Sequence, residues 1–569
     1  MPIRRLLLFF AVWVAAAQAQ VNVWVADDLT RVRPQQEAQG ATTAIVKAAR
    51  NEYAPFQIIV RAGAQGLKQV NAAAGDLAGE AGAAIPARHV ALYREHYIEV
   101  KTPSPKSKEG PGWYPDALIP FSAGAEGQPR FAGAPFDLEP GRNQPIWVDL
   151  FVPKDAAAGE YGGTITVTAA GQAAARVGIK LTVWDFALPD TPSMRSNFGS
   201  LSSRVANFYK ISAGSAQFQA LERQFAETLA AHRLSPPIPS WLRPRVNADG
   251  TIDASGTDDG LKDYIERYHV TGFPISLVGS DPLNKDRPRN VTYLQSIYEY
   301  LRARAWEQRA YIYVLDEPNT AEAYEEVRQR ARLIHEAQPG IKVLCTEQPT
   351  PQKPEWGTLV GSVDVWVPLW YLFEEPAGQE RLRAGEELWS YTALCQGPRG
   401  GDTPFWQLDF PLLNYRLPAW MSWRLGMTGL LYWTTAYWDP AIDLWTNPLS
   451  YRNQYNCEGV LLYPGADLAV PGLVTSMRLK EVREGMEDYE YIRMLAARGQ
   501  KEEADRLVRK IARTFTDWNS DPIDLYQVRE EIAKRILAAA SPAPPRPQPP
   551  RRRNAANSKP SVSLSLIRE

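Results

Sequence analysis

Two adjacent carboxylates, Asp316 and Glu317, directly follow an apolar run in the middle of the chain. The run Tyr311–Leu315 consists of aromatic, β-branched and aliphatic residues, as in a strand buried on both faces of a parallel sheet. Pro318 follows the pair and cannot extend a ladder of backbone hydrogen bonds. Charged groups at the C-terminal end of such a strand stand where α/β barrels keep their chemistry. The pair is therefore a candidate for acid–base catalysis, although a solvated turn before a helix gives the same pattern.

The reaction open to this pair depends on whether a second carboxylate faces it. Counting strands makes Tyr311–Leu315 the fourth of a barrel, and the seventh, Leu388–Leu394, runs into Cys395 and Gln396 without an acid. A retaining glycosidase needs a nucleophile about 5–5.5 Å from its acid, and an inverting one a base about 6.5–9.5 Å away. Where the protein supplies neither, a 2-acetamido oxygen of the substrate can attack the anomeric carbon. Two adjacent acids suit that reaction, because one orients the acetamide and the other serves the leaving oxygen and then water. Each carboxylate also disfavours ionisation of its neighbour, which helps to keep one protonated.

The composition narrows the classes of partner. The 63 Lys and Arg residues nearly balance 64 Asp and Glu, so no basic footprint for nucleic acid is present. The 18 Trp and 25 Tyr residues offer flat apolar faces with a polar edge, which suits sugar rings. The five histidines fall in no HxH or HExxH spacing, and no glycine-rich phosphate motif stands between a strand and a helix. We therefore expect a carbohydrate substrate and no metal or nucleotide cofactor.

The N-terminus has the pattern of a secretion signal. Arg4 and Arg5 precede the apolar run Leu6–Ala17, and cleavage is predicted after Ala19. The run is shorter than the roughly 20 residues that span a bilayer, so no membrane insertion is expected after cleavage. The pattern predicts a secreted or periplasmic protein, and it leaves the oligomeric state open. Only three cysteines are present, Cys345, Cys395 and Cys457, which make no disulfide framework and leave at least one without an intramolecular partner.

Residues 20–188 predict a β-sandwich, because short runs rich in β-branched and aromatic residues alternate with Gly and Pro. The expected strands are Val21–Ala26, Ile45–Ala48, Phe56–Arg61, His89–Val100, Ile146–Val152, Gly163–Ala169 and Val177–Asp185. Leu188–Pro192 is the expected linker to the next domain.

Residues 193–470 alternate strand and helix patterns and predict a (β/α)₈ barrel of the TIM type. The expected strands are Ser196–Ser200, Pro237–Leu242, Phe273–Val278, Tyr311–Leu315, Lys342–Thr346, Val363–Leu369, Leu388–Leu394 and Gly429–Trp433. The clearest helical patterns between them are Ala216–Arg233, Thr292–Gln308, Ala321–Ala337 and Leu412–Leu425.

Residues 471–540 predict a helical extension packed on the barrel, with helices over Val474–Arg498, Lys501–Thr514 and Asp524–Ala540. Residues 541–569 are rich in Pro, Arg, Ser and Asn and predict a disordered tail.

Five motifs resemble glycoside hydrolase family 123 and the related bacterial domain of unknown function 4091 over Val21–Arg498. They are Arg50–Phe56, Ala158–Thr164, Leu315–Pro318, Gly429–Trp433 and Arg483–Tyr491. The resemblance implies a retaining, exo-acting β-N-acetylgalactosaminidase that uses substrate-assisted catalysis. By that resemblance, Asp316 would orient the acetamide and Glu317 would be the general acid and base.

Several other residues are expected on the same face of the barrel. The candidates for substrate contacts are Trp370, Tyr371, Tyr391, Trp406, Trp433 and, as a polar contact, Asn197. Each aromatic residue alone is also a candidate for the core. The charged segment Arg483–Tyr491 has the pattern of a helix docked on the barrel with charge pairs along its own length, and we expect no catalytic role for it.

Two further interpretations stay open at this point. A glycan-binding or cell-surface protein on the same scaffold would have no need of both Asp316 and Glu317. A conventional glycosidase would take its second carboxylate from Glu347, Asp402 or Asp409.

Overall fold

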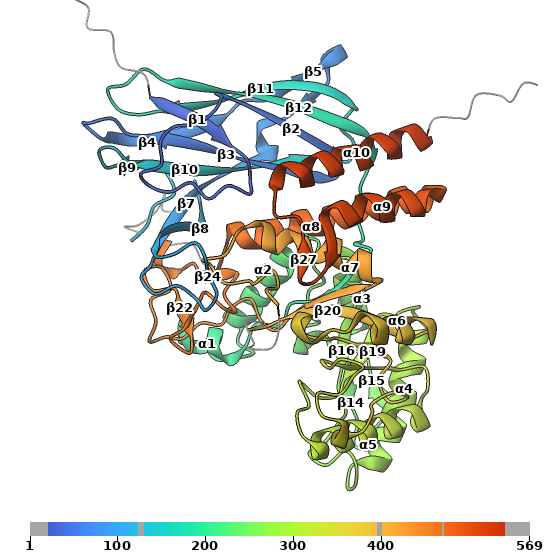
Figure 1. Cartoon of the computed structure of the whole chain (residues 1–569). Helices are drawn as coiled ribbons and strands as arrows, with labels where there is room; N and C mark the ends of the chain where they lie inside the picture. The colour runs from blue at the N-terminus through green and yellow to red at the C-terminus, as the bar shows by residue number, and fades with distance from the viewer. Residues whose placement is uncertain (1–20, 123–129, 395–400, 469–471, 541–569) are drawn as a thin grey trace, which may run out of the picture.

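The computed structural model describes residues 21–122, 130–394, 401–468 and 472–540 (Figure 1). The predicted signal peptide and the predicted tail therefore lie outside the described residues, as does Cys395. Figure 1 shows a sheet-rich N-terminal domain above a C-terminal domain of strands and helices, with the last helices beside and between them.

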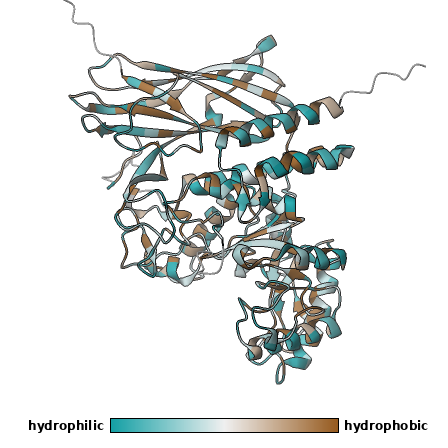
Figure 2. Cartoon of the chain, viewed as in Figure 1, coloured by the Kyte–Doolittle hydropathy of each residue, from teal (hydrophilic) through white to brown (hydrophobic). Residues whose placement is uncertain are grey.

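The N-terminal domain consists of two sheets that pack on a shared apolar core. One has the order β1-β3-β10-β7-β8, with β1 Asn22–Ala26, β3 Glu52–Arg61, β10 Asn143–Val152, β7 Val90–Val100 and β8 Gly112–Pro120. The other has the order β2-β12-β11-β4-β9, with β2 Thr43–Arg50, β12 Ala175–Ala187, β11 Gly159–Thr168, β4 Leu67–Ala74 and β9 Phe136–Leu138. The short strands β5 Leu77–Gly79 and β6 Ala84–Ile85 lie off that path. Buried and exposed residues alternate along β12, and Figure 2 shows the same banding on the sandwich strands.

All seven strands expected in this domain are present, but other strands were not predicted. Strand β4 reads LKQVNAAA, and its polar and alanine residues give little β propensity. Strand β8 contains Pro115 and Asp116, both of which are depleted in strands. Pairing with neighbouring strands, which the local sequence does not show, decides these two elements.

The C-terminal domain contains a nearly closed parallel barrel, and its sheet has seven strands in the described residues. The order is β13-β21-β20-β19-β18-β17-β16, with β13 Arg195–Asn197, β21 Gly429–Tyr432, β20 Glu387–Thr392, β19 Val365–Trp366, β18 Lys342–Cys345, β17 Ala310–Tyr313 and β16 Phe273–Ile275. Every neighbouring pair in this sheet is parallel.

The prediction of a strand over Pro237–Leu242, the second of the eight expected, was wrong. This segment contains Pro237 and Pro239, which have no N–H to donate to a ladder, and Ser240–Leu242 forms the 3₁₀ helix η3. Ser235 bridges the gap instead: its N–H donates to Ser196 Oγ at 2.7 Å, and its hydroxyl donates to the Gly272 carbonyl at 3.1 Å. Side-chain hydrogen bonds thus connect β13 to the approach of β16 where an eight-stranded barrel would have a strand.

Helices cover the outside of the barrel (Figure 1). They are α1 Ser203–Tyr209, α2 Ala216–Ala231, α3 Asp258–Arg267, α4 Arg287–Arg302, α5 Ala321–Ala337, α6 Glu375–Arg383 and α7 Leu413–Leu425. Helix α5 has the predicted bounds, because Thr320 caps it by accepting a hydrogen bond from the Ala323 N–H at 3.1 Å. This cap follows the Asp316–Glu317 pair at once and fixes where the loop after β17 must end.

The three C-terminal helices are α8 Met477–Leu495, α9 Lys501–Ile511 and α10 Pro522–Ala540. We expected all three to pack on the barrel, and this is wrong for α10. Helix α8 lies between the two domains, whereas α10 lies against the sandwich (Figure 1), where Glu530 pairs with Lys47 of β2 at 2.7 Å. The extension therefore joins the domains instead of extending one of them.

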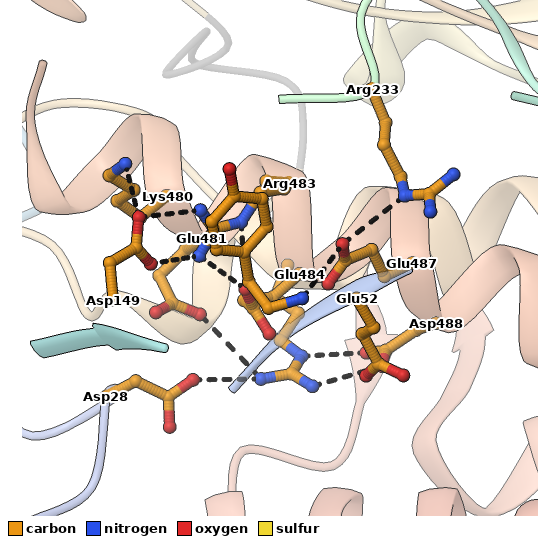
Figure 3. A network of polar contacts seen from close by, with 12 residues as sticks. Asp28, Glu52, Asp149, Arg233, Lys480, Glu481, Arg483, Glu484, Glu487 and Asp488 are labelled. Atoms are coloured by element: carbon orange, nitrogen blue, oxygen red, sulfur yellow. Dashed lines mark hydrogen bonds and ion pairs between the residues drawn. The ribbon is translucent and has the colours of Figure 1, made fainter. Parts of the chain in front are cut away.

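Helix α8 carries a buried network of charges to the sandwich (Figure 3). Asp149 of β10 accepts hydrogen bonds from Lys480 at 2.8 Å and from Arg483 at 2.7 Å. Asp488 accepts from Arg416 of α7 at 2.7 Å. The charges were expected to pair along the helix, but these pair across to other elements. Because an unpaired buried charge is costly, such pairs fix how the domains meet.

Candidate active site

The C-terminal ends of the barrel strands surround a layer of inward-facing side chains. Side chains two residues apart on a strand share a face, so Tyr311 and Tyr313 of β17 both point into the barrel. Tyr391 of β20 and Leu431 of β21 belong to the same interior cluster, against which Tyr313 and Trp433 pack. The register pairs Tyr391 with Leu431, which places Tyr391 and Trp433 on neighbouring strands at the open end.

Asp316 is held by two hydroxyl groups of this layer. Tyr313 Oη donates to Asp316 Oδ1 at 2.6 Å, and Thr346 Oγ1 donates to the same oxygen at 2.9 Å. Thr346 directly follows β18, the next strand of the sheet. The carboxylate is thus oriented by two adjacent strands, and both hydrogen bonds leave its second oxygen, Oδ2, to other partners.

The backbone of Glu317 departs from strand conformation. Its φ is 41°, in the left-handed region that non-glycine residues seldom adopt. Its N–H donates to Thr346 Oγ1 at 2.9 Å, and its carboxylate Oε1 accepts from Tyr391 Oη at 3.1 Å. In a regular strand the two acids would point to opposite faces. The left-handed residue allows both to be bound by side chains of the same barrel layer.

The two carboxylates differ in their electrostatic environment. Burial raises the pKa of Glu317, and the negative charge of Asp316 raises it further, while the hydrogen bond from Tyr391 opposes both. Burial and the same carboxylates raise the pKa of Tyr391, so its phenol stays a hydrogen-bond donor. Glu317 therefore holds its proton to higher pH than an ordinary glutamic acid, as a general acid must.

Of the three alternative carboxylates, only Glu347 belongs to this end of the barrel. It is buried, and burial raises its pKa to about 8, with a further rise from the charge of Glu317. Asp402 is exposed and pairs with Lys108 at 3.2 Å. Asp409 is buried, and its Oδ2 accepts a hydrogen bond from the Ser104 N–H of the sandwich at 2.6 Å. Asp402 and Asp409 thus serve contacts between the domains.

Trp370 and Trp406 lie in the core and not at the site, which corrects the sequence-based expectation. Each is only 1% exposed. Trp370 stacks on Phe515 with ring centroids 5.6 Å apart, and the indole N–H of Trp406 donates to the Asn414 carbonyl at 3.0 Å. Their ring faces pack against protein and have no surface to offer a sugar.

The other residues expected to contact substrate lie in different places. Trp433 is half-buried at the open end beside Tyr391. Asn197 ends β13 and donates from Nδ2 to Tyr311 Oη at 2.9 Å, so it crosses the barrel interior. Tyr371, in the 3₁₀ helix η5 Trp370–Leu372, is half-buried and packs against the large core of the domain.

Tyr313 and Thr346, the two residues that hold Asp316, were not among the residues predicted for the site. Both were in predicted strands, at positions that strand alternation turns inward at the C-terminal ends. The same alternation could have identified them, because a hydroxyl that faces the barrel interior near the strand ends needs a polar partner. Within the described ranges, no group of three or more His, Cys, Asp or Glu side chains is suited to a metal ion. The same ranges contain no helix of sufficient length and hydrophobicity to cross a bilayer.

A sheet-rich domain followed by a parallel barrel, with paired acids at the strand ends, indicates the class of glycoside hydrolases. Two family models agree with this class. Residues 24–169 match the glycoside hydrolase 123 N-terminal domain, and residues 281–495 match the glycoside hydrolase 123 catalytic domain. The chain belongs to glycoside hydrolase family 123.

A solved structure shows the same architecture. A family 123 glycoside hydrolase from Clostridium perfringens, whose structural study concerns glycolipid glycan hydrolysis, superposes with a TM-score of 0.64. It shares 15% sequence identity, and the match covers 91% of this chain and 97% of that one. A Bacteroides ovatus GH5 xyloglucanase matches 82% of this chain and 100% of its own at 9% identity, and its TM-score is only 0.23. No curated protein matches the chain.

Proposed function

We propose that this glycosidase is a secreted, retaining β-N-acetylhexosaminidase that uses the 2-acetamido group of its substrate as the nucleophile. The observation that carries the proposal is the separate fixation of the two adjacent acids. Asp316 is held by Tyr313 and Thr346, whereas Glu317 is held by Tyr391 and has a raised pKa. One carboxylate is thus oriented by two hydroxyl donors, while burial and the adjacent charge raise the pKa of the other.

The two acids would have different tasks in the first step. Asp316 accepts a hydrogen bond from the acetamide N–H through Oδ2, which raises the nucleophilicity of the acetamide oxygen. That oxygen attacks the anomeric carbon as the glycosidic C–O bond breaks, and Glu317 gives its proton to the leaving oxygen. The product is a cyclic oxazolinium ion whose positive charge the Asp316 carboxylate stabilises.

In the second step Glu317 acts as a base. Water attacks the anomeric carbon from the face that the leaving group vacated and gives a proton to Glu317. The ring opens, the acetamide is restored, and the sugar leaves with its original configuration. Glu317 is then protonated again, so the cycle closes without any further reactant.

A conventional two-carboxylate mechanism with Glu347 as the second acid is the runner-up. Glu347 is near enough for its pKa to respond to Glu317. With a pKa of about 8, however, Glu347 is mostly uncharged at neutral pH, and an uncharged carboxyl group is a poor nucleophile. This argument favours the acetamide as the nucleophile.

Export and the kind of glycan are further parts of the proposal. The charged, apolar and small-residue pattern of residues 1–19 supports a secreted or periplasmic location. The Clostridium perfringens structure concerns glycolipid glycans, so terminal N-acetylhexosamine residues of such glycans are the first natural substrates to test.

A panel of aryl β-glycosides with and without the 2-acetamido group tests the proposal. We expect cleavage only of the acetamido sugars, with the β-anomer as the first product by NMR. Equal cleavage of sugars that lack the group would exclude substrate assistance and favour Glu347. No cleavage of any member, with retained binding of the sugars, would instead identify a glycan-binding protein.

A further inference from the structure

Trp433 is the half-buried aromatic residue that continues β21 at the open end of the barrel. Its indole N–H does not point to solvent but donates to Glu458 Oε1 at 2.8 Å. Tyr437 packs on its ring at a centroid distance of 5.0 Å, and Tyr451 at 5.6 Å. The ring is therefore held by its polar edge as well as by apolar contacts.

Glu458 is buried, with 1% of its surface exposed, and it gathers three donors. Besides the Trp433 indole, Tyr432 Oη donates to Oε1 at 3.2 Å and Gln407 Nε2 donates to Oε2 at 2.5 Å. Tyr432 ends β21, Trp433 directly follows it, and Gln407 lies between β20 and α7. A buried carboxylate with this set of partners is a rigid anchor, because any rotation would break several hydrogen bonds at once.

The backbone next to Glu458 fits the edge of the same ring. Gly459 has a φ of 71°, and a Cβ atom there would lie 2.6 Å from Trp433 Cζ2. Its N–H donates to Tyr432 Oη at 2.8 Å, and its carbonyl accepts from the Tyr437 N–H at 2.9 Å. The Gly459 backbone thus forms hydrogen bonds with Tyr432 and Tyr437, which lie before and after Trp433 in the chain. Only a residue without a side chain allows so close an approach to the indole.

We propose that Glu458 is a positioning residue that fixes Trp433 as the stacking platform for the sugar bound at the Asp316–Glu317 pair. The proposal rests on the proposed glycosidase function and adds a residue that no sequence motif indicated. A fixed indole loses little conformational freedom on binding, so the stacking energy is available to the ligand. Glu458 itself touches no substrate and acts through the indole N–H alone.

The conservative substitution separates this role from a general need for a negative charge. In Glu458→Gln, the amide oxygen can still accept from Trp433 and Tyr432. Its NH₂ group then faces Gln407, whose amide can turn to present its oxygen. We expect Glu458→Gln to bind sugar nearly as the wild type does. Glu458→Ala removes the acceptor and should raise KM for an aryl N-acetylhexosaminide about three- to tenfold, the range of an aromatic stacking contact, with little change in kcat.

A double-mutant cycle with Trp433→Ala decides whether Glu458 acts through the indole. If it does, Glu458→Ala adds no further rise in KM once Trp433 is already Ala. Glu490→Ala is the matched control: its buried carboxylate accepts from the Ser193 N–H and hydroxyl, at the opposite end of the barrel strands. This control should lower stability and leave KM unchanged.

A second readout is independent of activity. In protein labelled with ¹⁵N-tryptophan, the indole signal of Trp433, identified by its loss in Trp433→Phe, should shift in Glu458→Ala and exchange with solvent faster. An unchanged KM in Glu458→Ala, or an equal further rise of KM in the Trp433→Ala background, would overturn the proposal. A wild-type protein that cleaves and binds no N-acetylhexosaminide would instead refute the proposed function, and the platform with it.

Discussion

The hydroxyl of Tyr391 on β20 donates a hydrogen bond to Glu317 Oε1, three strands away around the barrel, at 3.1 Å. A donor on one carboxylate oxygen stabilises the ionised form, so it opposes the burial and the Asp316 charge that raise the pKa of Glu317. Burial and two identified groups, Asp316 and Tyr391, thus set the pH at which the proposed general acid loses its proton, and each of the two groups can be changed separately.

The pH dependence of kcat/KM should follow those groups. In the proposed mechanism the protonated form of Glu317 is active, so activity is lost as pH rises through its pKa. Tyr391→Phe removes the stabilising donor, which raises the pKa and moves the alkaline limb to higher pH. Asp316→Asn removes the neighbouring negative charge and moves the same limb to lower pH. The control is Tyr300→Phe, since Tyr300 donates to Asp258 on the outer helices.

Those shifts are measured over pH 4 to 10 with an aryl substrate whose leaving group is poor, because its cleavage depends on the proton of Glu317. Opposite displacement of the limb by the two variants is the expected pattern. A limb that stays in place in both variants would assign the titration to another group, of which Glu347 with a pKa of about 8 is the first candidate.

The two acids should also respond differently to the leaving group. Glu317→Gln keeps the shape but removes the transferable proton, so substrates with poor leaving groups should lose about 10²–10⁴-fold in rate. An activated aryl leaving group needs little protonation and should lose less. Asp316→Asn weakens the acetamide nucleophile that all substrates share, so good and poor leaving groups should suffer alike. The measurement is a plot of log kcat/KM against leaving-group pKa for each variant, and parallel plots for both would contradict the division of roles.

The contact between domains should depend on Arg483. Arg483→Met leaves Asp149 buried with only Lys480 as a partner, and breaking a buried pair in this way costs about 3–5 kcal/mol. Arg513→Met is the control, because Arg513 pairs with Asp517 on the surface, where a pair contributes about 0–1 kcal/mol. Urea unfolding followed by tryptophan fluorescence measures both. Similar losses for the two variants would show that the network is not what holds the sandwich to α8.

Stability should be greatest in mildly acidic solution. Burial and the Glu52 charge raise the pKa of Glu487 to about 7, although Arg233 opposes this. Between the ordinary glutamate pKa and 7, the folded state binds the extra proton, so the free energy of unfolding falls as pH rises through this window. Arg483 and Lys480 lower the pKa of Asp149 despite its burial, so that contribution is lost at the acid end. In Glu487→Gln the slope between pH 5 and 8 should flatten, whereas a wild-type slope in this variant would assign it to other groups.

Much of the site's identity is local in sequence. The apolar run Tyr311–Leu315 and the acids that follow it predicted a strand that ends at paired carboxylates, and β17 covers Ala310–Tyr313 of this region, two residues shorter at its C-terminal end. The helical pattern over Ala321–Ala337 predicted α5 with its actual bounds, since a helical period is a short-range signal.

Features that depend on contacts between distant residues could not be predicted from the sequence, for a physical reason. Eight alternating units suggested eight strands, yet the prolines after Ser235 prevent pairing, and hydrogen bonds of the Ser235 N–H and side chain connect the neighbours instead. The charges of α8 were expected to pair along the helix itself, but Asp149, distant in sequence, accepts a hydrogen bond from Arg483 in a buried interface. A single sequence shows which groups are present but not which distant groups meet.

The sequence by itself thus determined the order of the domains, the strand that presents Asp316 and Glu317, and the chemistry open to two adjacent acids. Only the tertiary structure decided which side chains act on them. Trp370, Trp406 and Trp433 are all tryptophans that end or follow predicted barrel strands, but packing buries the first two and leaves the third half-buried. Tyr391, Thr346 and Glu458 acquire their places because closing a sheet into a barrel brings strand ends together that lie far apart along the chain.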